Sequence, residues 1–252
     1  MQLASRVFAG GLIASVSLLA SCGGVQAETK QWKASSYGSG QEQVIGSGRN
    51  VRATRPVSAF GTLSIDGPVD VVIRQGAPSL TLRAEDNIID LVKVKRKGDT
   101  LSLSTEGSFR TREGITAYLT VPSVEAVRIN ASGDVRFDGW DADAIELVIG
   151  GSGGIELGGT VPKVRALIQG SGDIDLAPVR VSHVDADIEG SGEIRMGSLA
   201  RLDATINGSG TIEAGVVGEL DAVLNGSGKI LYRSAERVVR MERNGSGRIA
   251  RH

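Results

Sequence analysis

Hydrophobic and polar residues alternate in short runs along the second half of the chain. A representative stretch is 164–176, in which apolar side chains occupy every second position on both sides of a Gly-Ser-Gly tripeptide. They are Val164, Ala166 and Ile168 before the tripeptide and Ile174 and Leu176 after it. Such alternation is typical of strands with one buried face, so the pattern predicts two short strands that meet at a sharp corner.

This strand–corner–strand unit is repeated along the chain. Each corner carries a Ser-Gly dipeptide, and the glycines follow one another at intervals of 18 to 20 residues: Gly133, Gly153, Gly172, Gly192, Gly210, Gly228 and Gly247. A fixed period of this length indicates a solenoid, in which each repeat buries its apolar side against its neighbours. We therefore expect an all-β fold, a single-stranded parallel β-helix with coils of about 18–20 residues. The glycines should supply corner backbone angles that bulkier residues avoid.

The position two residues before each corner serine is regular as well. It is Asn207, Asn225 and Asn244 in the last three coils. In a parallel stack these amides lie above one another, so we expect a ladder of hydrogen bonds, each stabilising by about 0.5–1.5 kcal/mol. A ligand-binding row of amides is the alternative. In the last coil Arg243 replaces the expected aliphatic residue, which an open solenoid end can tolerate.

Between about residue 57 and residue 123 the alternation continues without Ser-Gly corners. The stretch 60–76 has period two and is interrupted by Gly and Pro. The coils are expected to begin near residue 57, and 85–97 is compatible with a short helix or with a wider loop. Further strands are predicted at 80–84, 101–104, 115–121 and 124–129.

The motif Phe-X-X-Leu-X-Ile-X-Gly-Pro-X-Asp-Val-X-Ile-X-X-Gly at 60–76, followed by the Ser-Gly-Asp/Glu corners, is similar to the head GIN domain family of auto-transporter adhesins. The resemblance covers roughly residues 57–250. It implies a β-helix-like fold and a location in the cell envelope. It brings no catalytic, cofactor-binding or metal-binding residues.

The N-terminus has the layout of an export signal. Residues 1–22 contain an early arginine, an apolar run and the ending Leu-Ala-Ser-Cys, which resembles the lipobox of bacterial lipoproteins. We expect a signal peptide over 1–22, lipidation of Cys22, a flexible tether over 23–55 and the solenoid domain over 56–252. The membrane association would rest on this lipid anchor only.

The two glycines that follow Cys22 favour delivery to the outer membrane, on its periplasmic or its surface face. The alternative is cleavage after Ala27, which would give a soluble periplasmic protein.

Composition narrows the possible chemistry. Aromatic residues make up only 4% of the chain, so the core must consist mainly of aliphatic side chains. A single cysteine precludes an intrachain disulfide. The two histidines, His183 and His252, argue against a His-rich metal site and a His-based catalytic triad.

Charge is distributed unevenly. Residues 124–228 hold 7 basic and 17 acidic side chains, a net charge of −10, whereas 229–252 hold 7 basic and 2 acidic ones, a net charge of +5. This acidic body argues against nucleic acid as a partner, because phosphate binding needs a broad basic face. Self-association of the open solenoid ends is a further possibility.

Carboxylates are the candidates for catalysis. Asp134, Asp173, Asp175 and Glu193 follow corners, and Asp173 and Glu193 should be neighbours on adjacent coils. Glycosidases use such pairs, but Gly154 and Thr211 interrupt this row. A calcium β-roll is disfavoured because its repeat has nine residues. We predict no cofactor and no metal.

The predicted function is that of a non-enzymatic envelope module, an adhesin or interaction module that binds a glycan, a protein or an envelope component on its solenoid surface. The alternative is a carbohydrate-active β-helix enzyme with paired carboxylates.

Overall fold

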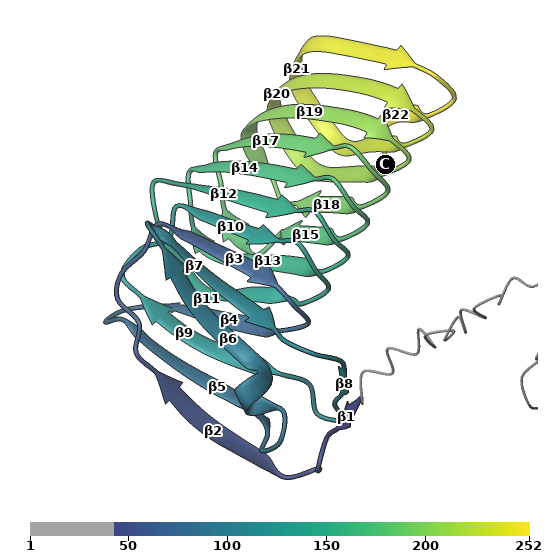
Figure 1. Cartoon of the computed structure of the whole chain (residues 1–252). Coiled ribbons are helices and arrows are strands. Elements are labelled where there is room, and N and C mark those ends of the chain that lie inside the picture. The colour runs from purple at the N-terminus through teal and green to yellow at the C-terminus, as the bar shows by residue number, and fades with distance from the viewer. Residues whose placement is uncertain (1–42) are drawn as a thin grey trace, which may run out of the picture. The chain divides into compact units, whose positions relative to one another are not determined.

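The protein was analysed as a computed structural model that describes residues 43–252 (Figure 1). These residues form twenty-two strands and one short 3-10 helix, and no α-helix occurs among them. Twenty of the strands belong to one continuous hydrogen-bonded array, whereas β1 (Val44–Ile45) pairs only with β8 (Phe109–Arg110). The predicted all-β class is confirmed.

From residue 126 onward every strand pairs in parallel with the strand one coil away. Register partners are 18 to 20 residues apart, as in Ile168 with Ile188 and Ile188 with Ile206. This confirms the predicted solenoid and its coil length. The strands are β10 (Ala126–Ile129), β11 (Val135–Asp141), β12 (Ala144–Ile149), β13 (Gly154–Thr160), β14 (Lys163–Ile168), β15 (Asp173–Leu176), β16 (Val179–Arg180), β17 (His183–Ile188), β18 (Glu193–Met196), β19 (Leu199–Gly208), β20 (Thr211–Gly226), β21 (Lys229–Asn244) and β22 (Arg248–Arg251).

The coils present two main faces to solvent. We call the face made by β10, β12, β14, β17, β19 and the second halves of β20 and β21 the first sheet. The face made by β11, β13, β15, β18, the first halves of β20 and β21, and β22 is the second sheet. The connection between the two faces carries a short third parallel pairing, for example Gly159 with Val179.

Aliphatic columns fill the space between the sheets. On the first sheet one inward column runs through Ile129, Ile149, Ile168, Ile188, Ile206 and Leu224, all with no exposed surface. Burial of such side chains contributes about 1.5–3 kcal/mol each before the entropy cost of folding is subtracted. Trp140 is buried as well and packs edge-on against Phe137, with 5.4 Å between the ring centroids.

The corner glycines meet the requirement expected from sequence at two corners and a second requirement at all seven. Gly226 and Gly245, which precede corner serines, have φ values of 134° and 135°, whereas the seven glycines that follow the corner serines lie outside the left-handed region. A Cβ on Gly192, however, would overlap the carbonyl oxygen of Gly172 in the preceding coil and contact the side chain of Ile168. The corners therefore require glycine because successive backbones stack too closely for a side chain.

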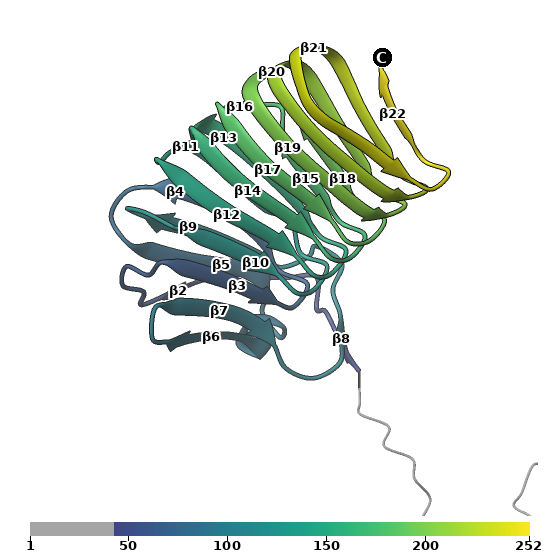
Figure 2. The same cartoon turned by 90° about the horizontal axis from the view of Figure 1, so that it is seen from above.

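The N-terminal part forms a cap that differs from the predicted coil pattern. It consists of β2 (Asn50–Arg55), β3 (Thr62–Asp66), β4 (Asp70–Gln75), β5 (Ser79–Glu85), the 3-10 helix η1 (Ile89–Leu91), β6 (Val92–Lys97), β7 (Thr100–Thr105) and β9 (Thr116–Val121). β3 and β4 join the solenoid by parallel pairing with β10 and β11. The pairs β2–β5, β5–β9 and β6–β7 are antiparallel, so the parallel arrangement does not extend over the whole of 56–252. Figure 2 shows the β2, β5, β6 and β7 layer at one end and β21 and β22 at the other.

The structure of the cap corrects two predictions made from the sequence. The predicted tether over 23–55 is wrong in its last part, because β1 and β2 belong to the folded unit and β2 is an integral strand of the sheet. In 85–97 the chain forms η1 and then the strand β6, so neither a helix nor a loop alone describes it. Cys22 and the predicted signal lie outside the described residues.

Glu85 is the buried charged residue of the described part of the chain. Its carboxylate accepts hydrogen bonds from the backbone N–H groups of Gly48, at 2.8 Å, and Arg112, at 3.2 Å. A hydrogen bond from the Thr111 hydroxyl, followed by these two N–H groups, outweighs burial and lowers the pKa of Glu85. This carboxylate fastens the segment before β2 to the loop before β9.

Candidate functional site

The outward side chains of the first sheet form charged columns that cross the coils. Most of their members pair with a neighbouring coil. Arg128 contacts Glu146 at 2.6 Å, and Arg240 contacts Asp221 at 2.8 Å. Asp203 is held by both Arg201 and His183, each at 2.9 Å. The opposite charges in these pairs neutralise each other, so this part of the surface has few unpaired charged groups.

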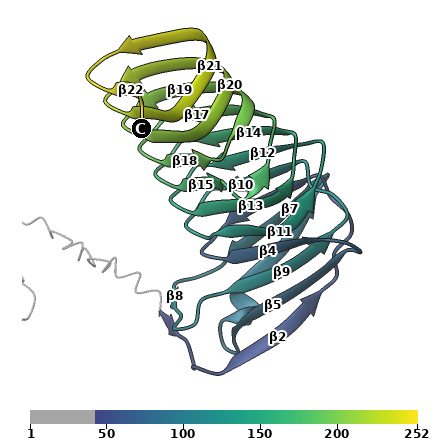
Figure 3. The ribbon, with the colours of Figure 1, turned by 180° about the vertical axis from the view of Figure 1, so that it is seen from behind.

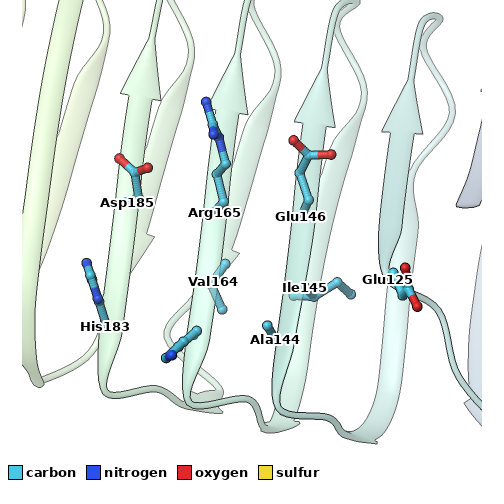
Figure 4. Close-up of a pocket in the computed structure, with 9 residues that line it drawn as sticks. Glu125, Ala144, Ile145, Glu146, Val164, Arg165, His183 and Asp185 are labelled. Carbon is cyan, nitrogen blue, oxygen red and sulfur yellow. The ribbon is translucent and has the colours of Figure 1, made fainter. Parts of the chain in front are cut away.

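A shallow hollow of about 460 Å³ interrupts this pattern at the N-terminal side of the first sheet (Figure 4). It forms at Ala144, because the same column continues with the longer side chains of Lys163, His183 and Arg201 in the next coils. In Figure 4 Glu146, Arg165 and Asp185 lie along one line across β12, β14 and β17, while Glu125 lies on the adjacent coil beside Ile145. The lining residues are Glu125, Ala144, Ile145, Glu146, Lys163, Val164, Arg165, His183 and Asp185.

Four charged side chains around the hollow take no part in these ion pairs. Within residues 43–252 Lys163, Arg165, Glu125 and Asp185 have no ion-pair partner within 4.0 Å. The hollow therefore offers two cationic donors and two carboxylate acceptors on a hydrogen-bonded parallel sheet. Such a set can hydrogen-bond to a polar ligand that brings both hydroxyl donors and oxygen acceptors.

One aspartate next to the hollow, Asp187, has a raised pKa. Burial raises the pKa of Asp187, the charges of Asp185 and Glu189 raise it further, and Arg165 opposes this. Burial also acts to raise the pKa of Asp203, but hydrogen bonds from Arg201 and His183 outweigh it, so the pKa of Asp203 is lowered. On the first sheet the surroundings thus disfavour the charged form of Asp187 and favour the charged form of Asp203.

The carboxylates singled out from sequence lie on the second sheet. Asp173 and Glu193 are register partners, as predicted, and Gly154 and Thr211 flank them in the same column. Asp175 occupies the next outward column, between Glu156 and Arg195. Asp134 is engaged in structure, because its Oδ1 accepts a hydrogen bond of 2.7 Å from the N–H of Gly154.

Asp134, Asp173 and Asp175 border a second open hollow of about 500 Å³, whereas Glu193 is not among the residues that line it. Glu193 lies 3.4 Å from Arg195, so one member of the proposed pair already has a cationic partner. No group of three or more His, Cys, Asp or Glu side chains in the described residues could hold a metal ion. The hollow on the second sheet thus brings together three of the predicted carboxylates, Asp134, Asp173 and Asp175, with the carboxylates of Asp70 and Glu156.

The predicted amide ladder is confirmed. Asn225 donates to Asn207 at 2.8 Å, and Asn244 donates to Asn225 at 3.0 Å. Further along the same row Gln169 donates to Glu189 at 2.9 Å. Because the amides bond to each other, the row acts as a structural ladder.

The sequence comparisons agree with the fold. Residues 59–235 match the model of a protein family described as "Putative auto-transporter adhesin, head GIN domain". The chain belongs to this family. Membership of the head GIN domain family favours an exported or envelope protein with an adhesin-like, non-enzymatic role.

Solved structures show the same fold as this head GIN domain. A "putative adhesin" from Bacteroides fragilis is 21% identical with a TM-score of 0.70, and the match covers 83% of this chain and 100% of that one. A "putative lipid binding protein" from Parabacteroides distasonis is 20% identical with a TM-score of 0.66, covering 84% and 100%. A "putative adhesin" from Parabacteroides merdae is 16% identical with a TM-score of 0.60, covering 83% and 99%.

No curated protein matches the sequence. Across residues 43–252 the structure contains no helix that is long and apolar enough to cross a membrane. The hollow at Ala144 was missed at the level of sequence. Aligning the outward columns would have revealed it, because alanine stands there in a column of long polar side chains.

Proposed function

We propose that this head GIN domain protein is a non-enzymatic interaction module of the cell envelope that binds an uncharged glycan at the hollow on its first sheet. The observation that carries the proposal is the set of unpaired donors and acceptors, Lys163, Arg165, Glu125 and Asp185, on a surface whose other charges are largely paired. The adhesin names of two similar structures support a surface-binding role.

A glycan suits this geometry for two reasons. Sugar hydroxyls both donate and accept hydrogen bonds, so they can satisfy ammonium, guanidinium and carboxylate groups at once. The coils repeat roughly every 4.8 Å, comparable to the length of one pyranose ring, so successive sugars could contact successive strands. An acidic glycan fits less well, because the surrounding body carries a net charge of −10 over 124–228.

The location proposed for this module is the outer membrane, to which lipidated Cys22 would attach it. The family membership supports export or an envelope location in general, and the lipobox-like ending supports the specific anchor. The lipid-binding name of one similar structure is compatible with a protein that works at this membrane.

The test is binding of purified residues 23–252 to immobilised dextran, mannan and amylose. The strand pairing described here lies within 44–251, so this chain keeps the folded unit. Lys163→Ala combined with Asp185→Ala should weaken binding of one of these glycans at least about tenfold, since each lost hydrogen bond to a charged group costs about 1.5–3 kcal/mol. The charge-matched control, Arg136→Ala with Glu156→Ala on the second sheet, should bind like the wild type.

Three results would contradict the proposal. One is equal loss of binding in both double variants, and another is retention of binding when the hollow is altered. The third is glycan cleavage that disappears in Asp173→Ala with Glu193→Ala while folding is kept, which would establish the carboxylate enzyme instead.

A further inference from the structure

The last coil is exposed on the side that faces away from the solenoid. Val238 of β21 pairs in register with Leu220 of β20. The register then shifts by one residue, and beyond the shift Met241 and Arg243 stand over Ala222 and Leu224. The three residues of β20 are completely buried. Figure 3 shows β21 and β22 as the outermost elements at this end.

Large apolar side chains are exposed on this coil. Val238 is 45% exposed, Val239 49% and Met241 43%. They are three of the six exposed large hydrophobic residues in the described part of the chain, and they fall within four positions. Exposed apolar residues that are scattered singly need no explanation, whereas a cluster of them indicates a contact surface.

Arginines lie on the same coil and on β22, with Glu242 between Met241 and Arg243. Arg243 and Arg251 occupy columns that are aliphatic or aromatic in the preceding coils, beyond Leu224 and Tyr232. Arg243 donates a hydrogen bond of 3.2 Å to the carbonyl of Gly247. Across residues 43–252 no carboxylate lies within ion-pair distance of Lys229, Arg233, Arg243, Arg248 or Arg251. Arg237 and Arg240 pair with Glu219 and Asp221 of the preceding coil, so +3 of the net charge of +5 over 229–252 is left without a partner.

We propose that this end of the solenoid docks onto an anionic phospholipid surface. Apolar side chains on a coil that also carries unpaired arginines suit the boundary between headgroups and acyl chains, where the apolar groups leave water and guanidinium groups pair with phosphate. The negative body, with a net charge of −10 over 124–228, is repelled by the same surface. The solenoid would therefore approach end-on, with β21 and β22 in contact with the lipid.

A second copy of the chain is a poorer occupant of this end. Tail-to-tail contact would bring two groups of arginines together. Natural sheets prevent pairing of their edges with bulges and inward-pointing charges. The register shift of β21 and the arginines in inward columns are features of this kind, so they oppose strand pairing with a second copy. A lipid surface needs no strand pairing, so these features do not oppose it.

The test is co-sedimentation of residues 23–252 with vesicles, because this chain lacks Cys22 and cannot carry a lipid anchor. Binding to phosphatidylcholine vesicles containing about 30% phosphatidylglycerol should be at least about tenfold tighter than to pure phosphatidylcholine, and should weaken as salt is added. Arg243→Glu combined with Arg251→Glu should reduce binding to the anionic vesicles at least about tenfold. Val239→Ser with Met241→Ser should also reduce it, without a change in charge.

The matched control is Lys163→Glu with Arg165→Glu, which makes the same change in charge at the hollow. This control should keep its vesicle binding and lose glycan binding, so that the two proposals fail separately. Circular dichroism and thermal unfolding verify that each variant is folded. The docking proposal is overturned by equal binding to neutral vesicles or by equal loss in the control. It is also overturned if vesicles are not bound and the end instead forms a dimer that Arg243→Glu abolishes in sedimentation analysis.

Discussion

The Nδ2 atom of Asn225 lies 2.8 Å from Oδ1 of Asn207 in the preceding coil, and Oδ1 of Asn225 in turn accepts a hydrogen bond from Asn244. A single side chain thus joins three successive coils near the C-terminal end. Since solenoid stability depends on contacts between neighbouring repeats, this relationship should be visible in unfolding experiments.

Asn225→Ala removes both of these hydrogen bonds and is expected to lower the free energy of unfolding by about 1–2 kcal/mol. Asn244→Ala removes one bond at the end of the ladder, so its effect should be about half as large. Urea unfolding followed by circular dichroism measures both. Equal effects of the two variants would show that the ladder does not act as a connected row.

Gly192→Ala tests the close stacking of the corners. The added Cβ would overlap the carbonyl oxygen of Gly172, and relieving this overlap should cost about 1–3 kcal/mol of stability. Gly197→Ala is the control, since its Cβ would meet its nearest neighbour, the carbonyl oxygen of Ala177, at an ordinary 3.7 Å. It should change stability by less than about 0.5 kcal/mol. If both variants unfold alike, stacking is not the reason for glycine at the corner.

The repeated part of the fold could be predicted because one physical rule, burial of every second residue against the next coil, applies to each repeat. That rule placed Asp173 beside Glu193 and Asn207 beside Asn225. It could not predict the cap, since β2 pairs with a strand about 30 residues further along and antiparallel to it. The missing long side chain at Ala144 can be read from its outward column, but which of the neighbouring charges pair depends on side-chain geometry that the repeat does not determine.

Acid should weaken the cap through Glu85. Its pKa is lowered from the ordinary value of 4.5 in the folded protein, so its stabilising contribution is present above that value and is lost as pH falls through the lower folded pKa. Glu85→Gln removes this titration. We expect the difference in melting temperature between the wild type and Glu85→Gln to be largest at neutral pH and to shrink below about pH 4.5. A difference that is independent of pH would contradict the role assigned to the carboxylate.

Asp187 should behave in the opposite way. Its pKa is raised in the folded state by burial and by Asp185 and Glu189, so the folded protein binds its proton more readily and loses stability as pH rises through this range. Asp187→Asn keeps the shape of the side chain and removes the charge. The variant should be more stable than the wild type at pH 7 and equal to it in acid, as measured by thermal unfolding across pH. Lower stability of the variant at pH 7 would refute the repulsion.

Lipidation of Cys22 is tested in cells that carry the full chain. Fatty-acid labelling should mark the wild-type protein and leave Cys22→Ala unmarked, because only the cysteine can carry the anchor. Since each buried methylene contributes about 0.8 kcal/mol to membrane attachment, loss of the acyl chains should move the protein from the outer-membrane fraction to the soluble fraction. Ser21→Ala, which keeps the cysteine and a small residue before it, is the matched control and should stay labelled.

Added protease then distinguishes the two faces of the membrane, since only a surface-exposed protein is digested in intact cells. An unlabelled, soluble periplasmic wild type would instead establish cleavage after Ala27 and remove the anchor from the proposed function.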